Sequence, residues 1–161
     1  MAEDPSARIS LAVEQSLWET AADLTGDANF GLHTAEAVQA GVFDVLDYAI
    51  RTAPSLAAAL ERLARYSRLE HEQAVFQLVS GTAATRLEHS FGQGGVLPCR
   101  QEAEFTLASI VIIGRQIVDG GLEPLAVEFM HETPPDIHEH VRIFKVLPRF
   151  QTRVNALELD S

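Results

Sequence analysis

Histidines are the residues of this chain best suited to chemistry, because imidazole binds metals and transfers protons near neutral pH. His138 and His140 lie two residues apart in a segment expected to be helical, where that spacing separates side chains by about 200° around the axis. Such a pair cannot hold one ion from one face, so we expect a solvated helical surface there. His33 and His71 have no neighbour at ligand spacing, and Cys99 is the single cysteine. The sequence therefore predicts no metal site and no cofactor.

Two further histidines continue the apolar side of predicted strands. His89 follows Leu87 at the two-residue period of a strand, and His131 follows Phe129 in the same way. A polar group that points inward needs a partner. Two interpretations stay open: each histidine is satisfied by groups of the core or its rim, or it contacts a ligand inside a cavity.

Charged residues at helical spacing give a second set of candidates. Arg100 and Glu104 stand four residues apart near the start of a long predicted helix. They form an ion pair, or Glu104 accepts hydrogen bonds from a cationic or hydroxyl-bearing ligand. Arg65 belongs to a series of arginines spaced every three residues, with Tyr66 beside it. This strip is either solvated or a small anion site, because guanidinium groups bind carboxylate and phosphate in bidentate fashion.

Catalytic motifs are missing from the sequence. It has no Gly-x-Ser-x-Gly elbow, no phosphate loop and no dinucleotide glycine pattern, so we expect no enzyme. Acid–base chemistry by His89 or His131 with Glu104 would require that these side chains meet in space. The residues predicted to contact a ligand are Arg65, Tyr66, His89, Arg100, Glu104 and His131.

The elements that must position these residues follow from apolar spacing. Over the first 70 residues the period is three to four, which predicts helices at roughly 10–24, 30–39, 43–52 and 55–70. A period of two then predicts a hairpin over residues 74–78 and 85–91. Further on, we expect a long helix with its apolar stripe at 103–118, a strand at 125–129, a short helix at 137–144 and one or two strands within 146–159. Glycine-rich loops at 92–95 and 119–121 flank the long helix.

This order of elements predicts an α+β fold. Helices should pack on one face of a mostly antiparallel sheet of four to five strands, because hairpin connections cannot join parallel neighbours. A chain of 161 residues with 47% hydrophobic residues is enough for one well-filled domain.

The charge balance excludes one class of partner. Twelve Lys and Arg against 23 Asp and Glu give a net charge of −11, which opposes binding to a phosphate backbone, so we expect no nucleic acid to bind this domain alone. The first eight residues are acidic and show no apolar leader, and no apolar run approaches the about 20 residues that span a bilayer. We therefore expect a cytoplasmic protein without a membrane partner.

A longer sequence pattern resembles a known family. The run Leu24-Thr25-Gly26-Asp27-Ala28-Asn29-Phe30-Gly31-Leu32 resembles the amino-terminal, arabinose-binding-type sensor domain of AraC/XylS transcription regulators. Segments around Asp47-Tyr48-Ala49, Leu63-Ala64-Arg65-Tyr66, Val127-Glu128-Phe129-Met130-His131 and Asn155-Ala156-Leu157 keep the family's order over nearly the whole chain. The sequence departs from the family at Phe144-Lys145-Val146-Leu147, where a glycine-containing turn is more usual.

The resemblance implies a function. In such regulators the amino-terminal domain senses a small molecule, while a carboxy-terminal pair of helix-turn-helix motifs binds promoter DNA. We expect residues 1–161 to be the sensing domain, with the DNA-binding domain absent from this chain. A small polar metabolite would enter a cavity between helices and sheet, contact some of the six predicted residues and shift a conformational or homodimer equilibrium. The alternative is a ligand-independent dimerisation or protein-interaction module.

Overall fold

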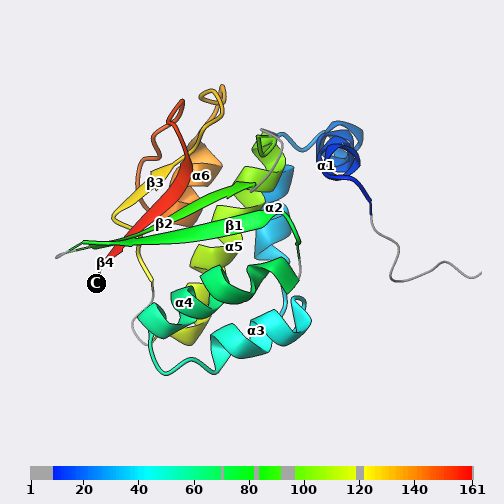
Figure 1. Cartoon of the computed structure of the whole chain (residues 1–161). Coiled ribbons are helices and arrows are strands. Elements are labelled where there is room, and N and C mark those ends of the chain that lie inside the picture. Colours follow the sequence, from blue (N-terminus) through cyan, green and yellow to red (C-terminus); the bar gives the residue numbers. More distant parts are fainter. Residues whose placement is uncertain (1–8, 70, 82–83, 92–96, 119–121, 161) are drawn as a thin grey trace, which may run out of the picture.

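The computed structural model describes residues 9–69, 71–81, 84–91, 97–118 and 122–160 (Figure 1). Within these residues the chain forms six α-helices and one four-stranded antiparallel sheet, which confirms the α+β prediction. The helices are α1 (Leu11–Thr25), α2 (Phe30–Glu36), α3 (Asp44–Arg51), α4 (Leu56–Tyr66), α5 (Arg100–Ile117) and α6 (His138–Phe144). The strands are β1 (Ala74–Ser80), β2 (Ala84–Phe91), β3 (Ala126–Glu128) and β4 (Asn155–Asp160).

The predicted elements are present with small changes at their ends. The fourth helix ends at Tyr66 and continues as a short 3₁₀ turn, Ser67–Leu69. Of the one or two strands predicted within 146–159, the described residues form one, β4. The glycine-rich loops predicted at 92–95 and 119–121 lie outside the described residues. No described helix is both long enough and apolar enough to cross a membrane.

Local sequence signals explain where the first helices start and stop. The Ser10 hydroxyl accepts a hydrogen bond from the Val13 N–H at 3.4 Å, and the Ser55 hydroxyl accepts one from the Ala58 N–H at 3.2 Å. These bonds satisfy amide groups that lack a partner in the first turn of a helix. Gly26 ends α1 with φ of +67°, a left-handed conformation that glycine adopts without a steric penalty.

The sheet has the strand order β1-β2-β4-β3. In the hairpin, Phe76 lies opposite His89 on the neighbouring strand, and in the centre of the sheet Leu87 lies opposite Leu157. Leu87 and His89 are buried on the face that the helices cover, with α4 against β1 and α5 against β4 (Figure 1). Arg86 and Glu88 alternate with them and form an ion pair on the other face.

A close contact between α2 and α5 explains Gly31, which belongs to the run of residues 24–32 that resembles the family. The Gly31 N–H donates to the Gln101 side-chain oxygen at 2.8 Å, and the Gln101 amide group donates to the Ala28 carbonyl at 3.1 Å. A Cβ on Gly31 would lie 2.0 Å from the Gln101 carbonyl oxygen, which is far inside van der Waals contact. The motif therefore sets the distance between α2 and the central helix α5.

Substitution of Gly31 tests this contact. Gly31→Ala should lower the free energy of unfolding by about 3 kcal/mol or more, because the two helix backbones must separate to admit the methyl group. Gly26→Ala is the matched control. It meets no atom within 4 Å, so only the left-handed backbone costs energy there, about 1–2 kcal/mol. Urea unfolding measures both values, and equal losses would contradict the close-contact explanation.

Candidate functional site

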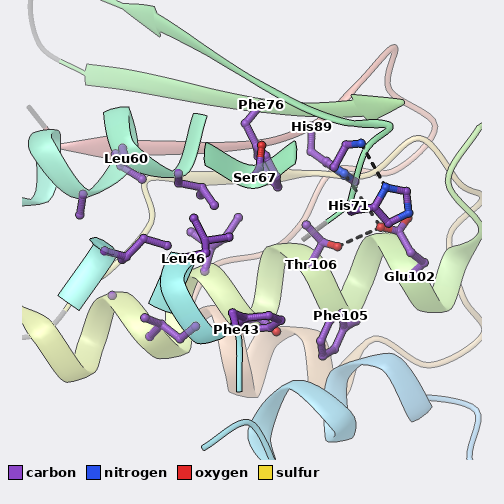
Figure 2. Close-up of a pocket in the computed structure, with 18 of the residues that line it drawn as sticks. Phe43, Leu46, Leu60, Ser67, His71, Phe76, His89, Glu102, Phe105 and Thr106 are labelled. Atoms are coloured by element: carbon purple, nitrogen blue, oxygen red, sulfur yellow. Dashed lines mark hydrogen bonds and ion pairs between the residues drawn. The ribbon is translucent and has the colours of Figure 1, made fainter. Parts of the chain in front are cut away.

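A cavity of about 290 Å³ lies between the helices and the sheet (Figure 2). This volume is near the lower end of the range for ligand sites, about 300–1,000 Å³. Its walls are mainly apolar and come from α3, α4, α5 and β1, with Leu46, Leu60, Phe76, Phe105 and Ile113 among them. The cavity therefore has room for a small molecule with an apolar body.

One end of the cavity is polar. Figure 2 shows His71, His89, Glu102 and Thr106 gathered there, away from Leu60. The Thr106 hydroxyl donates to Glu102 Oε1 at 3.0 Å, and His89 Nε2 lies 3.9 Å from the same oxygen. The His89 ring stacks on Phe76, with 4.8 Å between ring centroids. Packing and a hydrogen bond thus fix the two ionisable groups, His89 and Glu102.

The hydrogen bonds of His71 assign its tautomer. His71 Nδ1 accepts from the N–H groups of Gln73 and Ala74 at 3.3 and 3.2 Å. The proton therefore lies on Nε2, which donates to Glu14 Oε2 at 2.9 Å. This contact joins α1 to the segment before β1 at the polar end of the cavity.

Four polar atoms that belong to the cavity lining are buried and have no hydrogen-bond partner within the described parts of the chain. They are Ser67 Oγ, His89 Nδ1, Glu102 Oε2 and Ser109 Oγ. Leaving such an atom unpaired costs about 1–3 kcal/mol. Their collection around one cavity is the arrangement of a site whose contents supply hydrogen bonds.

Burial shifts both ionisable groups of the polar end toward their neutral forms. The apolar surroundings raise the pKa of Glu102 to about 8, and the negative charge of Glu14 contributes to this rise. Burial also lowers the pKa of His89 to about 4. At pH 7 the carboxyl group is therefore mostly protonated and the imidazole is neutral.

A second polar cluster lies on the opposite face of α5, around the fully buried Glu104. Glu104 Oε1 receives hydrogen bonds from Arg100 Nε at 2.8 Å and from His140 Nε2 at 2.7 Å. His131 Nε2 lies 3.4 Å from the same oxygen without a hydrogen bond to it. Arg100 also donates to Asn29 Oδ1 at 3.1 Å. This cluster ties α5 to α6 and to the start of α2, so it stabilises the fold.

The six residues predicted from the sequence separate into three groups. His89 lines the cavity. Arg100, Glu104 and His131 meet in the cluster around Glu104. Arg65 is exposed and lies over the ring of Tyr66, 5.4 Å from its centroid, and neither residue is in the described lining of the cavity. Ligand contact by these residues stays a prediction.

Residues 1–161 match the family described as the arabinose-binding domain at the N-terminus of AraC transcription regulators. The chain belongs to this family. This is the family that the resemblance in the sequence predicted.

One solved relative shows the same fold. The crystal structure of the transcriptional regulator CdpR from Pseudomonas aeruginosa has a TM-score of 0.67 and 13% sequence identity. The match covers 95% of this chain and 56% of that chain, so this regulatory domain spans little more than half of that regulator's chain. A comparison with curated proteins finds no match.

The prediction that His140 lies on a solvated helical surface is wrong. His140 is fully buried against Glu104, while His138, two residues earlier, is exposed. The short helix α6 turns one face toward α5, so the same spacing that excluded a shared metal ion placed the two histidines in different environments.

Sequence reasoning also missed the polar lining that α5 supplies. Glu102, Thr106 and Ser109 all face the cavity, and they follow the helical spacing of four and three residues. Ile113 continues the same face, four residues after Ser109. A polar row in line with a buried apolar stripe was the signal that could have identified this face as a cavity wall.

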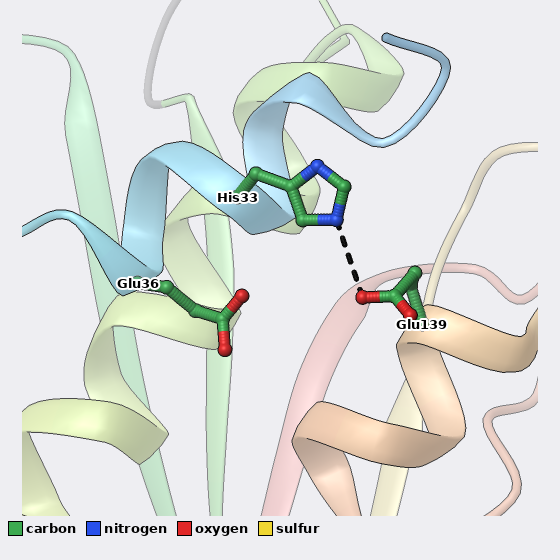
Figure 3. Close-up of side chains that lie close together, drawn as sticks. All are labelled: His33, Glu36 and Glu139. Atoms are coloured by element: carbon green, nitrogen blue, oxygen red, sulfur yellow. Dashed lines mark hydrogen bonds and ion pairs between the residues drawn. The ribbon is translucent and has the colours of Figure 1, made fainter.

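Another cluster has the composition of a metal site (Figure 3). Ligand atoms of His33, Glu36 and Glu139 lie within 4.8 Å of one another. Asp27 bonds His33 Nδ1 at 2.7 Å, and Arg142 donates to Glu36 at 2.6 and 2.8 Å and to Glu139 at 2.7 Å. Because the Arg142 guanidinium already bonds both carboxylates, and lowers the pKa of Glu36 and Glu139, we assign no ion to this cluster.

The pH dependence of stability tests the protonation of Glu102. The folded chain holds a proton up to about pH 8 that an unfolded glutamate, with a pKa of 4.5, releases. The free energy of unfolding should therefore fall as the pH rises through this range, by less than about 1.4 kcal/mol per pH unit. Glu102→Gln should reduce the fall between pH 7 and 8, whereas Glu61→Gln, at an exposed position, should not.

Histidines with shifted pKa values also titrate, but both variants retain them. His89 and His131, whose pKa values burial lowers, contribute stability that is lost as the pH falls below 6.5. His33, with its raised pKa, contributes stability that is lost as the pH rises above its ordinary value of 6.5. The difference between wild type and Glu102→Gln in urea unfolding therefore reports Glu102. Parallel pH curves for these two proteins would contradict the assignment.

Proposed function

We propose that this domain senses an effector that binds in the cavity between α3, α4, α5 and the sheet. The observation that carries the proposal is the presence of four unpartnered buried polar atoms around one mainly apolar cavity. The sequence predicted a small polar metabolite, and the lining favours one with an apolar body and a polar end. Such a molecule would cover the apolar walls and supply the missing hydrogen bonds.

The position of α1 offers a route from binding to regulation. The helix reaches the polar end of the cavity through Glu14, which bonds His71, and through Trp18, whose ring lies 4.9 Å from that of Phe105. Glu14, Trp18 and Phe105 all line the cavity, so an occupant would touch the contacts that hold α1 in place.

A tenfold to hundredfold regulatory effect requires about 1.4–2.8 kcal/mol of differential affinity between two states. One or two hydrogen bonds made in a single state would supply it. We propose that this shift controls a DNA-binding domain.

A substitution that fills the cavity tests the site. Ala59 is buried in the lining, whereas Ala57, two residues earlier on α4, is exposed. Small molecules that co-purify with the domain, together with a metabolite panel, should be measured by mass spectrometry and calorimetry. Ala59→Phe should weaken binding at least tenfold because its ring occupies the ligand space, and Ala57→Phe should leave binding unchanged. Urea unfolding shows that each variant folds. A metabolite that binds Ala59→Phe as tightly as wild type would place the effector elsewhere.

A second candidate function is dimerisation through α1. Val13, Leu17 and Leu24 are exposed on one side of this helix, with exposed fractions of 49%, 56% and 83%. Their spacing of four and seven residues matches the stripe that one helix presents to another. We propose that this stripe contacts the same helix of a second copy, which is compatible with effector binding in the cavity.

Charge placed on the stripe tests the homodimer. Leu17→Glu should weaken the dimer at least tenfold, because two carboxylates would face each other in an apolar contact. Ala12→Glu adds the same charge at an exposed position of α1 outside the stripe and should leave the association unchanged. Native mass spectrometry over a range of protein concentrations measures both. A monomeric wild type, or equal association of the two variants, would rule out this surface.

A further inference from the structure

We infer that the effector is a lipophilic organic cation, an apolar body that carries a protonated amine, with its charged group placed against Glu102. This inference rests on the proposed function, because it takes the cavity as the effector site. It adds the charge and the chemical class of the ligand. Three independent features of the cavity support a cationic ligand.

The first feature is the sign of the ionisable groups. Two carboxyl groups, those of Glu14 and Glu102, line the cavity, and no arginine or lysine does so among the described residues. Both ring nitrogens of His71 are already engaged, Nδ1 by backbone N–H groups and Nε2 by Glu14, so neither is available to a head group. An anionic head group would lose its hydration without gaining a cation. A cationic head group would gain a carboxylate partner.

The second feature is the hydrogen-bonding capacity of the polar end. Glu102 is more than nine-tenths buried, and its Oε2 has no partner in the described chain, while Oε1 accepts from Thr106. His89 Nδ1 is also buried and unpartnered, on the ring whose Nε2 lies 3.9 Å from Glu102 Oε1. A neutral imidazole can accept at this nitrogen when its proton is on Nε2. An ammonium group has several N–H donors, so it can supply the hydrogen bond that Glu102 Oε2 lacks.

The third feature is the aromatic character of the walls beside these acceptors. Trp18, Phe43, Phe76 and Phe105 line the cavity, and the Trp18 and Phe105 rings are 4.9 Å apart. The face of an aromatic ring attracts a cation and at the same time offers apolar surface. These rings therefore suit the alkyl or aryl body of an amine as well as its charge.

Proton linkage follows from this arrangement and separates a cation from a neutral ligand. In the empty cavity Glu102 is mostly protonated at pH 7, because burial raises its pKa to about 8. A bound ammonium group favours the carboxylate, so the carboxyl proton leaves to solvent as the ion pair forms. Binding of an amine should therefore release up to one proton at pH 7, and its affinity should rise from pH 6 to pH 8. A neutral ligand that binds the protonated carboxyl group should release none.

The experiment compares octylamine, octanol and octanoate by calorimetry on the whole chain at pH 7. These probes share an alkyl body and differ in the charge of the head group. Octylamine should bind at least tenfold more tightly than the other two, a difference of about 1.4 kcal/mol. Titrations in buffers of different ionisation enthalpy should show the released proton, a readout that needs no variant protein.

Two variants complete the test. Glu102→Gln keeps the shape of the side chain but cannot ionise, so it should lose at least tenfold in affinity for octylamine and abolish proton release. It should keep the wild-type affinity for octanol, which shows that the cavity is intact. Glu61→Gln, at an exposed position on α4, should bind all three probes as wild type does.

The failures of this inference and of the proposed function are distinguishable. Tighter binding of octanol or octanoate than of octylamine overturns the assignment of a cationic ligand and leaves the cavity as the effector site. Octylamine binding without proton release, or with wild-type affinity in Glu102→Gln, overturns the role of Glu102. Binding of none of the three probes also overturns the inference. The comparison of Ala59→Phe with Ala57→Phe on the metabolite panel then decides the proposed function separately.

Discussion

Helix α5 is buried on two opposite faces, and the rest of this structure depends on that constraint. One face packs against α2 and α6, where Gly31 allows the backbones of α2 and α5 to touch. The other face looks toward the sheet, α3 and α4 across the cavity. Polar side chains on these two faces are buried, so a polar group there that finds no partner inside the molecule costs free energy.

Two glutamates of α5 meet this constraint in different ways. Glu104 is fully buried and is held by Arg100 and His140, which makes it part of the framework. Glu102 has only the Thr106 hydroxyl as a hydrogen-bond donor, and its second oxygen is left without a partner in the described chain. Each carboxyl group therefore has one oxygen without a partner in the described chain, and the two differ in what surrounds them. The Arg100 guanidinium and the His140 ring hold Glu104, whereas Glu102 lines the cavity and has one hydroxyl donor, and this difference separates the structural cluster from the candidate site.

Much of the fold was predictable because it depends on local signals. Caps at Ser10 and Ser55 and the left-handed Gly26 fix the helix ends, and the two-residue period around Leu87 and His89 fixes the faces of the hairpin. The end of α4 and the number of final strands were less certain, since they depend on packing and pairing between segments distant in sequence.

The sequence by itself determined the order of the elements, the inward direction of His89, the helical spacing that brings Arg100 to Glu104 and the family to which the chain belongs. These properties depend on neighbours a few residues away or on a pattern along the chain. Only the tertiary structure decided that Glu102 faces a cavity while Glu104 faces α6, and that His140 is buried. The physical reason is that helical periodicity states which residues share a face, whereas the packing of other elements decides what each face meets.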